Sequence, residues 1–288
     1  MEYFLQIAVD TIVLASLYTL IGTGFSLRYS LVKYLDIGFA VYMTLGAYAY
    51  LVFSKYFGLY AFVYSVLFSA IVAYICERFY FAKLEDRKSS PMIMMIASLG
   101  FMTLVQAIIA MMFTSNVQGL RTDISVYNVV GVAITDVKVV SILCAFIFVI
   151  LLNLILKRTK FGSHIRAIND NKALAETTGI PVKKISLVIA SISAGVATLA
   201  GILYGMDTSV DPLMGMSLLL SGVTASIIID IQDAKKVYIG AIILATIQNI
   251  VVWFLGGEWK DAIVFLLLIV ILLVRPEGLL GKKLIRTV

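Results

Sequence analysis

Charged residues are scarce in this chain of 288 residues, where Asp, Glu, Lys and Arg together make up 14%. Soluble domains contain about 25% charged residues on average. Hydrophobic residues, by contrast, make up 61% of the chain. The shortage of charge excludes an ordinary soluble domain and predicts an all-α, polytopic integral membrane protein.

Cysteine and histidine are also rare. Cys76 and Cys144 lie far apart, within or at the end of apolar segments, so we expect both to be free thiols. His164 is the single histidine of the chain. With so few soft ligands we expect no metal site.

Motifs for catalysis are missing as well. No stretch fits the ATP-binding pattern G-x-x-x-x-G-K-[ST], and Gly278 and Gly281 lack its spacing. Paired carboxylates and a catalytic triad are also absent from the sequence. We therefore expect no cofactor bound by this chain and no enzymatic activity. The function that remains is a conduit for a solute across the membrane. The net charge of +6 reflects the loops on one side of the membrane rather than contact with nucleic acid.

Apolar segments fill most of the chain and predict eight or nine transmembrane or re-entrant helices of about 20 residues each. We expect a single membrane domain over residues 1–288, with a first segment that is retained because it lacks a basic flank and a cleavage site. The seventh segment is short, and the ninth contains Lys260 and Asp261, so either can fail to span fully. The segments are 3–27, 31–53, 57–76, 91–113, 137–156, 185–206, 213–229, 237–257 and 259–274.

Lys and Arg alternate between the loops in a way that predicts the topology. Short loops rich in these residues stay on the cytoplasmic side. With nine segments and the loop 157–184 inside, 19 of the 23 basic residues lie inside, which puts the N-terminus outside and the C-terminus in the cytoplasm. The inside residues are Arg28, Lys33, Arg78, Lys83, Arg87, Lys88, the seven basic residues from Lys157 to Lys184, Lys235, Lys236, Arg275, Lys282, Lys283 and Arg286.

The loop 157–184 is the longest polar interval of the chain. Asn169 or Asp170 can cap the start of a short helix there, and Gly179 followed by Pro181 ends it. The sequence therefore predicts a short, capped helix on a basic cytoplasmic loop. A basic inside loop is by itself a feature of any polytopic membrane protein.

The loop sequence GSHIRAINDNKALAETTGIPVKKI resembles the cytoplasmic loop of the permease subunits of branched-chain amino acid ABC transporters, the LivH type. Three other stretches resemble the same family in the same order: LDIGFAVYMTLGAYAY, ERFYFAKLEDRKSSPMIMMIASLGFM and LVRPEGLLGKK. In that family the loop docks on the ATPase subunit. The resemblance implies an ATPase-coupling role for Arg166, Asn169, Asp170, Ala175, Glu176 and Gly179.

Two departures from the family pattern affect the expected substrate path. Asp36 stands where the family has Asn, and Gly38 where it has Ala. The family's Gly-rich loop after the seventh segment is replaced by a charged DIQDAKK stretch, with Ile229, Asp230, Gln232 and Lys236 at the glycine positions. Because of the second departure, the resemblance alone does not fix the substrate or the packing near the gate of the transport path.

Polar groups and helix breakers in the second and fourth segments are the candidates for a substrate path, namely Asp36, Gly38, Gly100 and Gln106. An ionised Asp facing lipid costs about 2.5–3.5 kcal/mol on insertion scales. Asp36 therefore either forms an i, i+3 pair with Lys33, or lies in a break of the helix beside the path. The sequence leaves both alternatives open.

The sixth segment carries a line of small residues at helical spacing. This line lets another helix approach closely, and a packing seam inside one subunit is favoured over a subunit interface. The line comprises Ala190, Ala194, Ala197, Gly201 and Gly205.

The resemblance implies a permease subunit of an ABC importer in the bacterial inner membrane. Its partners would be two ABC ATPase subunits that use the ATP, a second related permease subunit or a second copy of itself, and a periplasmic substrate-binding protein. The implied substrate is a small polar solute such as a branched-chain amino acid, and related permeases handle urea, amides, sugars or nucleosides. A secondary transporter or channel without an ATPase is the alternative, but it would show inverted repeats and paired intramembrane charges. A structural membrane subunit that transports nothing is a further alternative.

Overall fold

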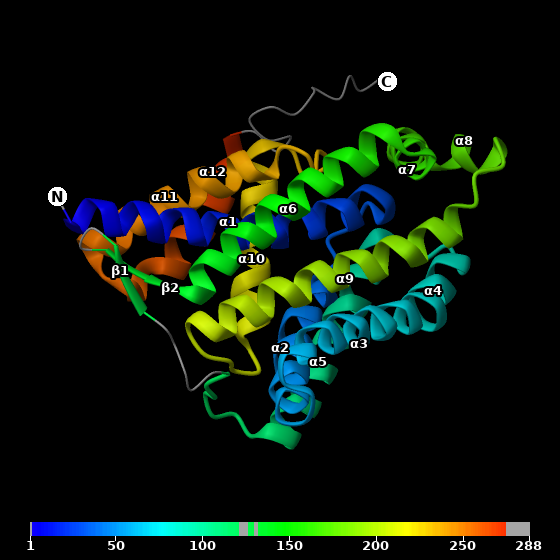
Figure 1. The fold of residues 1–288 in the computed structure, drawn as a ribbon. Coiled ribbons are helices and arrows are strands. Elements are labelled where there is room, and N and C mark those ends of the chain that lie inside the picture. The colour runs from blue at the N-terminus through cyan, green and yellow to red at the C-terminus, as the bar shows by residue number, and fades with distance from the viewer. Residues whose placement is uncertain (1, 121–125, 130–131, 275–288) are drawn as a thin grey trace.

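Long helices make up most of the structure, a computed structural model that describes residues 2–120, 126–129 and 132–274 (Figure 1). The C-terminal stretch with Arg275, Lys282, Lys283 and Arg286, and with most of LVRPEGLLGKK, lies outside the described residues. The long helices are α1 (Glu2–Val32), α2 (Ala40–Phe57), α3 (Ala61–Cys76), α5 (Pro91–Phe113), α6 (Asp136–Arg158), α9 (Val182–Asp207), α10 (Met214–Ile229), α11 (Val237–Leu255) and α12 (Lys260–Val274).

Seven helices among the described residues are long and apolar enough to cross a membrane. The helices α10 and α12 are apolar but shorter, and they bring the described candidates to nine. The prediction of an all-α polytopic membrane protein is therefore confirmed. Cys76 and Cys144 are free thiols, as predicted.

The first three helices have boundaries that differ from the prediction. Helix α1 continues to Val32, where Lys33 adopts a left-handed conformation with φ 57°. The chain then stays non-helical up to the 3-10 turn η1 (Ile37–Phe39), so the second span begins later than predicted. Helix α3 continues through a π-helical turn, η3 (Glu77–Phe81), into α4 (Ala82–Asp86). The predicted ends of the remaining helices lie within three residues of the observed ones.

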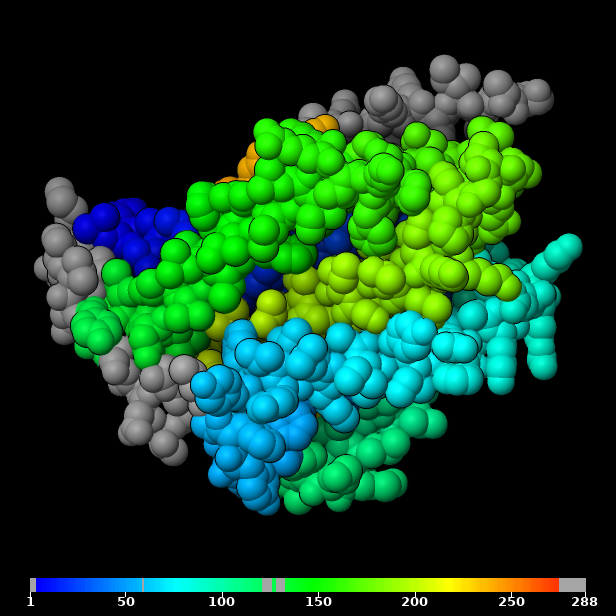
Figure 2. Space-filling model, turned by 45° about the vertical axis from the view of Figure 1, so that its right-hand side comes forward, coloured from blue at the N-terminus to red at the C-terminus, as the bar shows by residue number. Residues whose placement is uncertain are grey.

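Helix α9 lies near the centre of the bundle and packs against α1, α2 and α3. At Gly201 it touches α2, because a Cβ there would lie 2.3 Å from the carbonyl oxygen of Met43. Ala197 is fully buried in the same seam, whereas Gly205 lies against Val210 beyond the end of the helix. The small-residue line thus lies inside one chain. Figure 2 shows α9 as a band between α6 and α3 on one face of the molecule.

The ends of the long helices lie at two opposite ends of the molecule (Figure 1). One of them, called the basic end here, holds the end of α1, α4, the short helices α7 (Lys160–Asp170) and α8 (Lys172–Thr177), and the loop 230–236. The opposite end holds the start of α1 and the turn between α11 and α12, which contains η4 (Gly257–Trp259). Those of the loops predicted to lie inside the cell that the structure describes therefore gather at one end.

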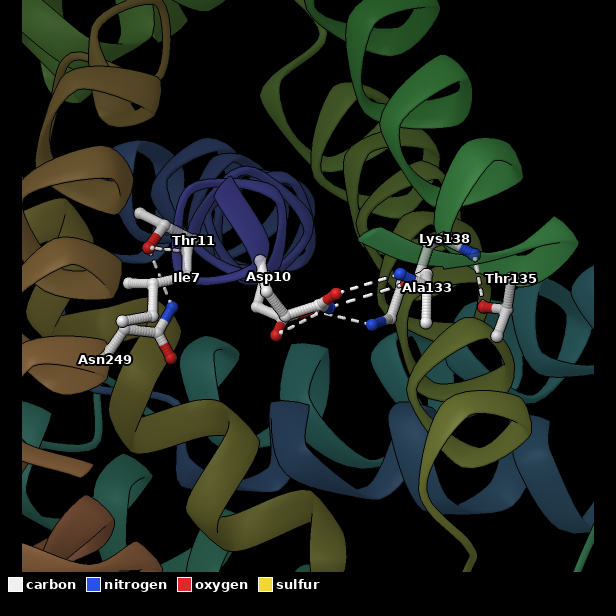
Figure 3. A network of polar contacts seen from close by, with 8 residues as sticks. Ile7, Asp10, Thr11, Ala133, Thr135, Lys138 and Asn249 are labelled. Carbon is white, nitrogen blue, oxygen red and sulfur yellow. Dashed lines mark hydrogen bonds and ion pairs between the residues drawn. The ribbon is translucent and has the colours of Figure 1, made fainter. Parts of the chain in front are cut away.

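A β-hairpin precedes α6 at the opposite end, with β1 (Val126–Val129) antiparallel to β2 (Val132–Thr135). The backbone N–H of Ala133 donates to the Gln6 side chain at 3.0 Å, and the Lys138 ammonium pairs with Asp10 at 2.7 Å (Figure 3). On the other side of α1, Asn249 of α11 donates to Thr11 at 2.9 Å. These contacts fasten the hairpin, α6 and α11 to the first helix.

Candidate functional site

Two short helices form a platform at the basic end, where the sequence predicted one. Thr159 caps α7, because its hydroxyl accepts from the N–H of Gly162 at 3.1 Å. Asn171 caps α8, with its side-chain oxygen accepting from the N–H of Leu174 at 3.0 Å. The prediction that Asn169 or Asp170 starts a helix is wrong, because both residues lie in the last turn of α7. Asn169, Asp170 and Asn171 are all good N-cap residues, so residue type alone did not select Asn171 as the cap.

The first helix of the platform is fixed to the end of α6. A Cβ on Gly162 would lie 2.5 Å from the carbonyl oxygen of Leu156, so only glycine fits at this contact. The Arg166 guanidinium donates to the same carbonyl and to the Ser163 hydroxyl, the latter at 3.1 Å. An arginine thus satisfies a carbonyl that the end of α6 leaves without a helical partner. Arg166 therefore positions α7 against the end of α6.

The second helix presents a small exposed surface. Ala175 is buried at 3% exposure and faces the chain's own apolar cluster, whereas Glu176 is exposed. Leu174 is 61% exposed, an unusual position for leucine at an end rich in polar residues. Gly179 follows with φ 84°, a conformation that favours glycine, and ends the platform as predicted. Sequence reasoning missed Leu174, although its place in the capped helix pointed to an outward face.

An ion pair connects the platform to α4, because Lys172 of α8 pairs with Glu85. Directly after the platform, Lys183 in the first turn of α9 pairs with Asp86 at 2.6 Å. Lys33, at the end of α1, donates to Asn169 of α7. The platform therefore contacts the break between α1 and α2 on one side and α4 on the other.

Lys33 also contacts the loop 230–236, because its ammonium donates to Gln232 at 2.8 Å. Burial lowers the pKa of this ammonium, while Asp170 and Asp230 oppose the shift. In the loop, the carbonyl oxygen of Ile231 accepts from Ser26 of α1 at 2.7 Å. The charged stretch that replaces the family's glycines thus lies at the basic end, next to the platform.

Three buried charges lie one layer deeper. Arg28, Asp36 and Glu77 are 3%, 2% and 5% exposed. The Arg28 guanidinium donates to Asp36 and, at 2.9 Å, to Glu77, whose other oxygen accepts from Ser186 of α9 at 2.8 Å. Of the two alternatives for Asp36, the i, i+3 pair with Lys33 is wrong, because Asp36 pairs with Arg28. The cluster joins α1, the helix break, η3 and α9, and π-helical turns such as η3 are frequent at functional sites.

The four candidate path residues divide into two pairs. Asp36 is extended and precedes η1, so it lies in a break as the second alternative required, but between α1 and α2 rather than inside the second span. A Cβ on Gly38 would lie 3.1 Å from an oxygen of Asp36 and 3.1 Å from the carbonyl of Ser98 on α5. Gly100 and Gln106 lie further along α5, and Gly100 has open space beside it. The structure therefore brings Asp36 and Gly38 together and leaves Gly100 exposed and Gln106 half-buried on α5.

The fold and the platform define a multi-pass membrane protein whose basic end carries a separate two-helix extension. The chain belongs to the family described as "Branched-chain amino acid transport system / permease component", whose model matches residues 7–272. The resemblance carried by the four sequence stretches is thereby confirmed.

Individual relatives agree with the family. The chain is 24% identical over 296 residues to "High-affinity branched-chain amino acid transport system permease protein LivH" of Salmonella typhimurium, covering 97% of this chain and 96% of that protein. It is 28% identical over 174 residues to "Probable branched-chain amino acid transport permease protein LivH" of Methanocaldococcus jannaschii, covering 57% and 54%. Its fold is similar to that of a chain in "PsaBC from Streptococcus pneumoniae in complex with Fab", with a TM-score of 0.55, 13% identity and coverage of 96% and 93%.

Proposed function

We propose that residues 1–288 form one permease domain of an ABC importer for branched-chain amino acids, driven by ATP hydrolysis in partner subunits. The observation that carries this proposal is the platform of α7 and α8, which is fixed to the bundle and exposes Leu174 and Glu176 at the basic end. The family and the names of the relatives support the transport role and the substrate class.

The platform is the docking surface for an ATPase subunit. Leu174 fills an apolar depression of the partner, and Glu176 and Asp170 at its border meet basic side chains there. Arg166, Asn169, Ala175 and Gly179 hold the platform in shape from behind. ATP is bound and hydrolysed by the partner, and this chain binds no cofactor.

The complete importer contains two such ATPase subunits, a second related permease subunit or a second copy of this chain, and a periplasmic substrate-binding protein. The basic end faces the cytoplasm of a bacterium, because short loops rich in Lys and Arg resist translocation. The N-terminus is then outside the inner membrane, and the C-terminus is cytoplasmic. The binding protein docks at the opposite end, where the hairpin is fastened to α1.

The conformational change of the ATPase reaches the substrate path through two series of contacts. One runs from Lys172 to Glu85 and along η3 to Glu77, and the other from Asn169 to Lys33. Both end at the break that contains Asp36 and Gly38. With Gly100 and Gln106 on α5, these residues line the path that alternates between the two sides of the membrane.

Co-expression with the ATPase, the second permease subunit and the binding protein tests the proposal. The chain should co-purify with the ATPase, hydrolyse no ATP alone, and import leucine, isoleucine and valine into ATP-loaded proteoliposomes. Import of urea, a sugar or a nucleoside instead would contradict the substrate class. Import of any solute without ATPase would contradict the ABC mechanism.

A further inference from the structure

A cavity of about 260 Å³ opens between α10 and α12. It lies at the end opposite the platform, because its lining starts at the first residues of both helices. This volume is slightly below the range of roughly 300–1,000 Å³ found for drug-sized ligands, so it suits a small solute. The lining residues are Leu213, Met216, Ser217, Leu220, Asp261, Val264 and Phe265.

The lining combines an apolar wall with two polar groups. Ser217 already donates to the carbonyl of Met214 at 3.1 Å, so its hydroxyl oxygen remains as an acceptor. Asp261 is exposed and has no ion pair among the described residues. Its neighbour Lys260 lies over the ring of Tyr204 instead, 5.9 Å from the centroid. The cavity therefore offers an exposed carboxylate that has no ion pair or hydrogen bond among the described residues and interacts with Lys260 only at longer range.

We infer that this cavity is the first contact site for an aliphatic α-amino acid, with Asp261 binding the substrate ammonium and the apolar wall binding its side chain. The inference rests on the proposed function and names the recognition chemistry of that path. The substrate carboxylate stays on the open side, towards water, because no basic side chain lines the cavity.

The same lining argues against the other solute classes. A sugar or nucleoside needs partners for many hydroxyl groups, and a buried polar group without a partner weakens binding. Two polar side chains do not supply them. An apolar anion would be repelled by Asp261. An aliphatic solute with a positive charge matches both halves of the lining.

The position of the cavity connects it to the rest of the path. Helix α10 packs on α1, α2, α11 and α12, and it extends from the cavity at Leu213 to the basic end at Ile229. Its opposite face touches α2, since a Cβ on Gly215 would lie 2.3 Å from the carbonyl of Ala40, next to η1. A solute entering at Asp261 is thus separated from the Gly38 region by one helix.

Photolabelling of the complete permease–ATPase complex in nanodiscs tests the inference. The probe is a leucine analogue with a diazirine in its side chain, applied without binding protein so that labelling reports on the permease alone. We expect the label on peptides containing Met216–Leu220 or Val264–Phe265. Excess leucinol, which keeps the ammonium, should compete, whereas 4-methylpentanoate, which lacks it, should not.

The decisive variant is Asp261→Asn, with Glu258→Gln as the matched control. Glu258 lies in η4, three residues before Asp261 in the first turn of α12, and does not line the cavity. Asp261→Asn should lower labelling about tenfold and raise the leucine concentration needed for competition, Asp261→Glu should restore most of it, and Glu258→Gln should change neither. Size-exclusion chromatography confirms that each complex assembles.

Unchanged labelling in Asp261→Asn, or label only on other helices, overturns the inference while leucine import by the wild-type complex continues. A wild-type complex that assembles but imports no branched-chain amino acid defeats the proposed function instead.

Discussion

The Arg28 guanidinium on α1 donates to the Glu77 carboxylate at the π-helical turn over 2.9 Å, with both side chains almost completely buried. Asp36 occupies the other side of the same guanidinium. One positive charge therefore holds two carboxylates from separate elements. Arg28 is the point at which the first helix, the helix break and the third helix are joined.

Arg28→Ala should destabilise the protein strongly. Removing one partner of a buried ion pair costs roughly 3–5 kcal/mol, because the remaining charges lose their compensation. We expect a lower yield and a clearly lower melting temperature in detergent. Arg78→Ala is the control, since Arg78 is exposed on η3, the turn that holds Glu77, and surface substitutions change stability by about 0.5 kcal/mol or less. Equal melting temperatures for the two variants would contradict a joining role for Arg28.

Arg166→Ala should weaken the link between the ATPase and the path without affecting membrane insertion. The variant loses a hydrogen bond to the Leu156 carbonyl, a contact of roughly 0.5–1.5 kcal/mol, which corresponds to about two- to tenfold in the population of the docked platform. Substrate-stimulated ATPase activity and leucine uptake should fall by that factor. Lys184→Ala, at an exposed position in the first turn of α9, should leave both unchanged. Normal uptake in Arg166→Ala would show that α7 holds its position without this arginine.

The sequence predicted the helices well where an apolar run ends at an abrupt polar boundary. The span 91–113 agrees with α5 because Ser90 and Pro91 mark its start, and Ser90 indeed accepts from the N–H of Ile93. The break at Lys33 was misplaced because a lysine in a left-handed conformation carries no sequence signal. Its cause is tertiary, since Lys33 reaches Asn169 and Gln232 far along the chain.

The candidate site was predicted only in part for a similar reason. The loop, its basic character and its end at Gly179 follow from local residue types. Helical spacing could not predict the partner of Asp36, because Arg28 lies eight residues earlier on another element. The third member of the cluster, Glu77, lies 49 residues from Arg28 in sequence. The β-hairpin was missed because its short strands have few residues and depend on Gln6 of α1 for their anchor.

Gly201→Val should disrupt the seam between α9 and α2. A Cβ at this position would lie 2.3 Å from the Met43 carbonyl oxygen, which is backbone and cannot move aside. Overpacking a tight contact costs about 1–3 kcal/mol or more, so the melting temperature should fall. Gly100→Ala is the matched control for stability of the isolated chain, because nothing lies within 4 Å of the Cβ position there. A loss in the control as large as that in Gly201→Val would contradict the seam.

Asp36 offers the sharpest test of the helix break. One of its oxygens accepts from Arg28, and the other has no hydrogen-bond partner among the described residues despite being buried. Asp36→Asn keeps an oxygen acceptor for Arg28 and leaves the single positive charge paired with Glu77 alone. We therefore expect normal assembly and leucine uptake within about twofold of the wild type, because neutral and charged acceptors of one hydrogen bond differ by only a modest free energy.

Asp36→Leu separates a role in the path from a role in stability. Leucine is similar in size to aspartate but leaves a guanidinium N–H of Arg28 without an acceptor, at a cost of about 1–3 kcal/mol. If Asp36 lies beside the path, this variant should still assemble with the ATPase, while uptake falls at least tenfold and basal ATP hydrolysis continues. Leucine uptake in proteoliposomes and co-purification distinguish the outcomes. Failure to assemble would make Asp36 a structural partner of Arg28, and normal uptake would remove it from the path, since an apolar side chain cannot replace a polar contact to a passing solute.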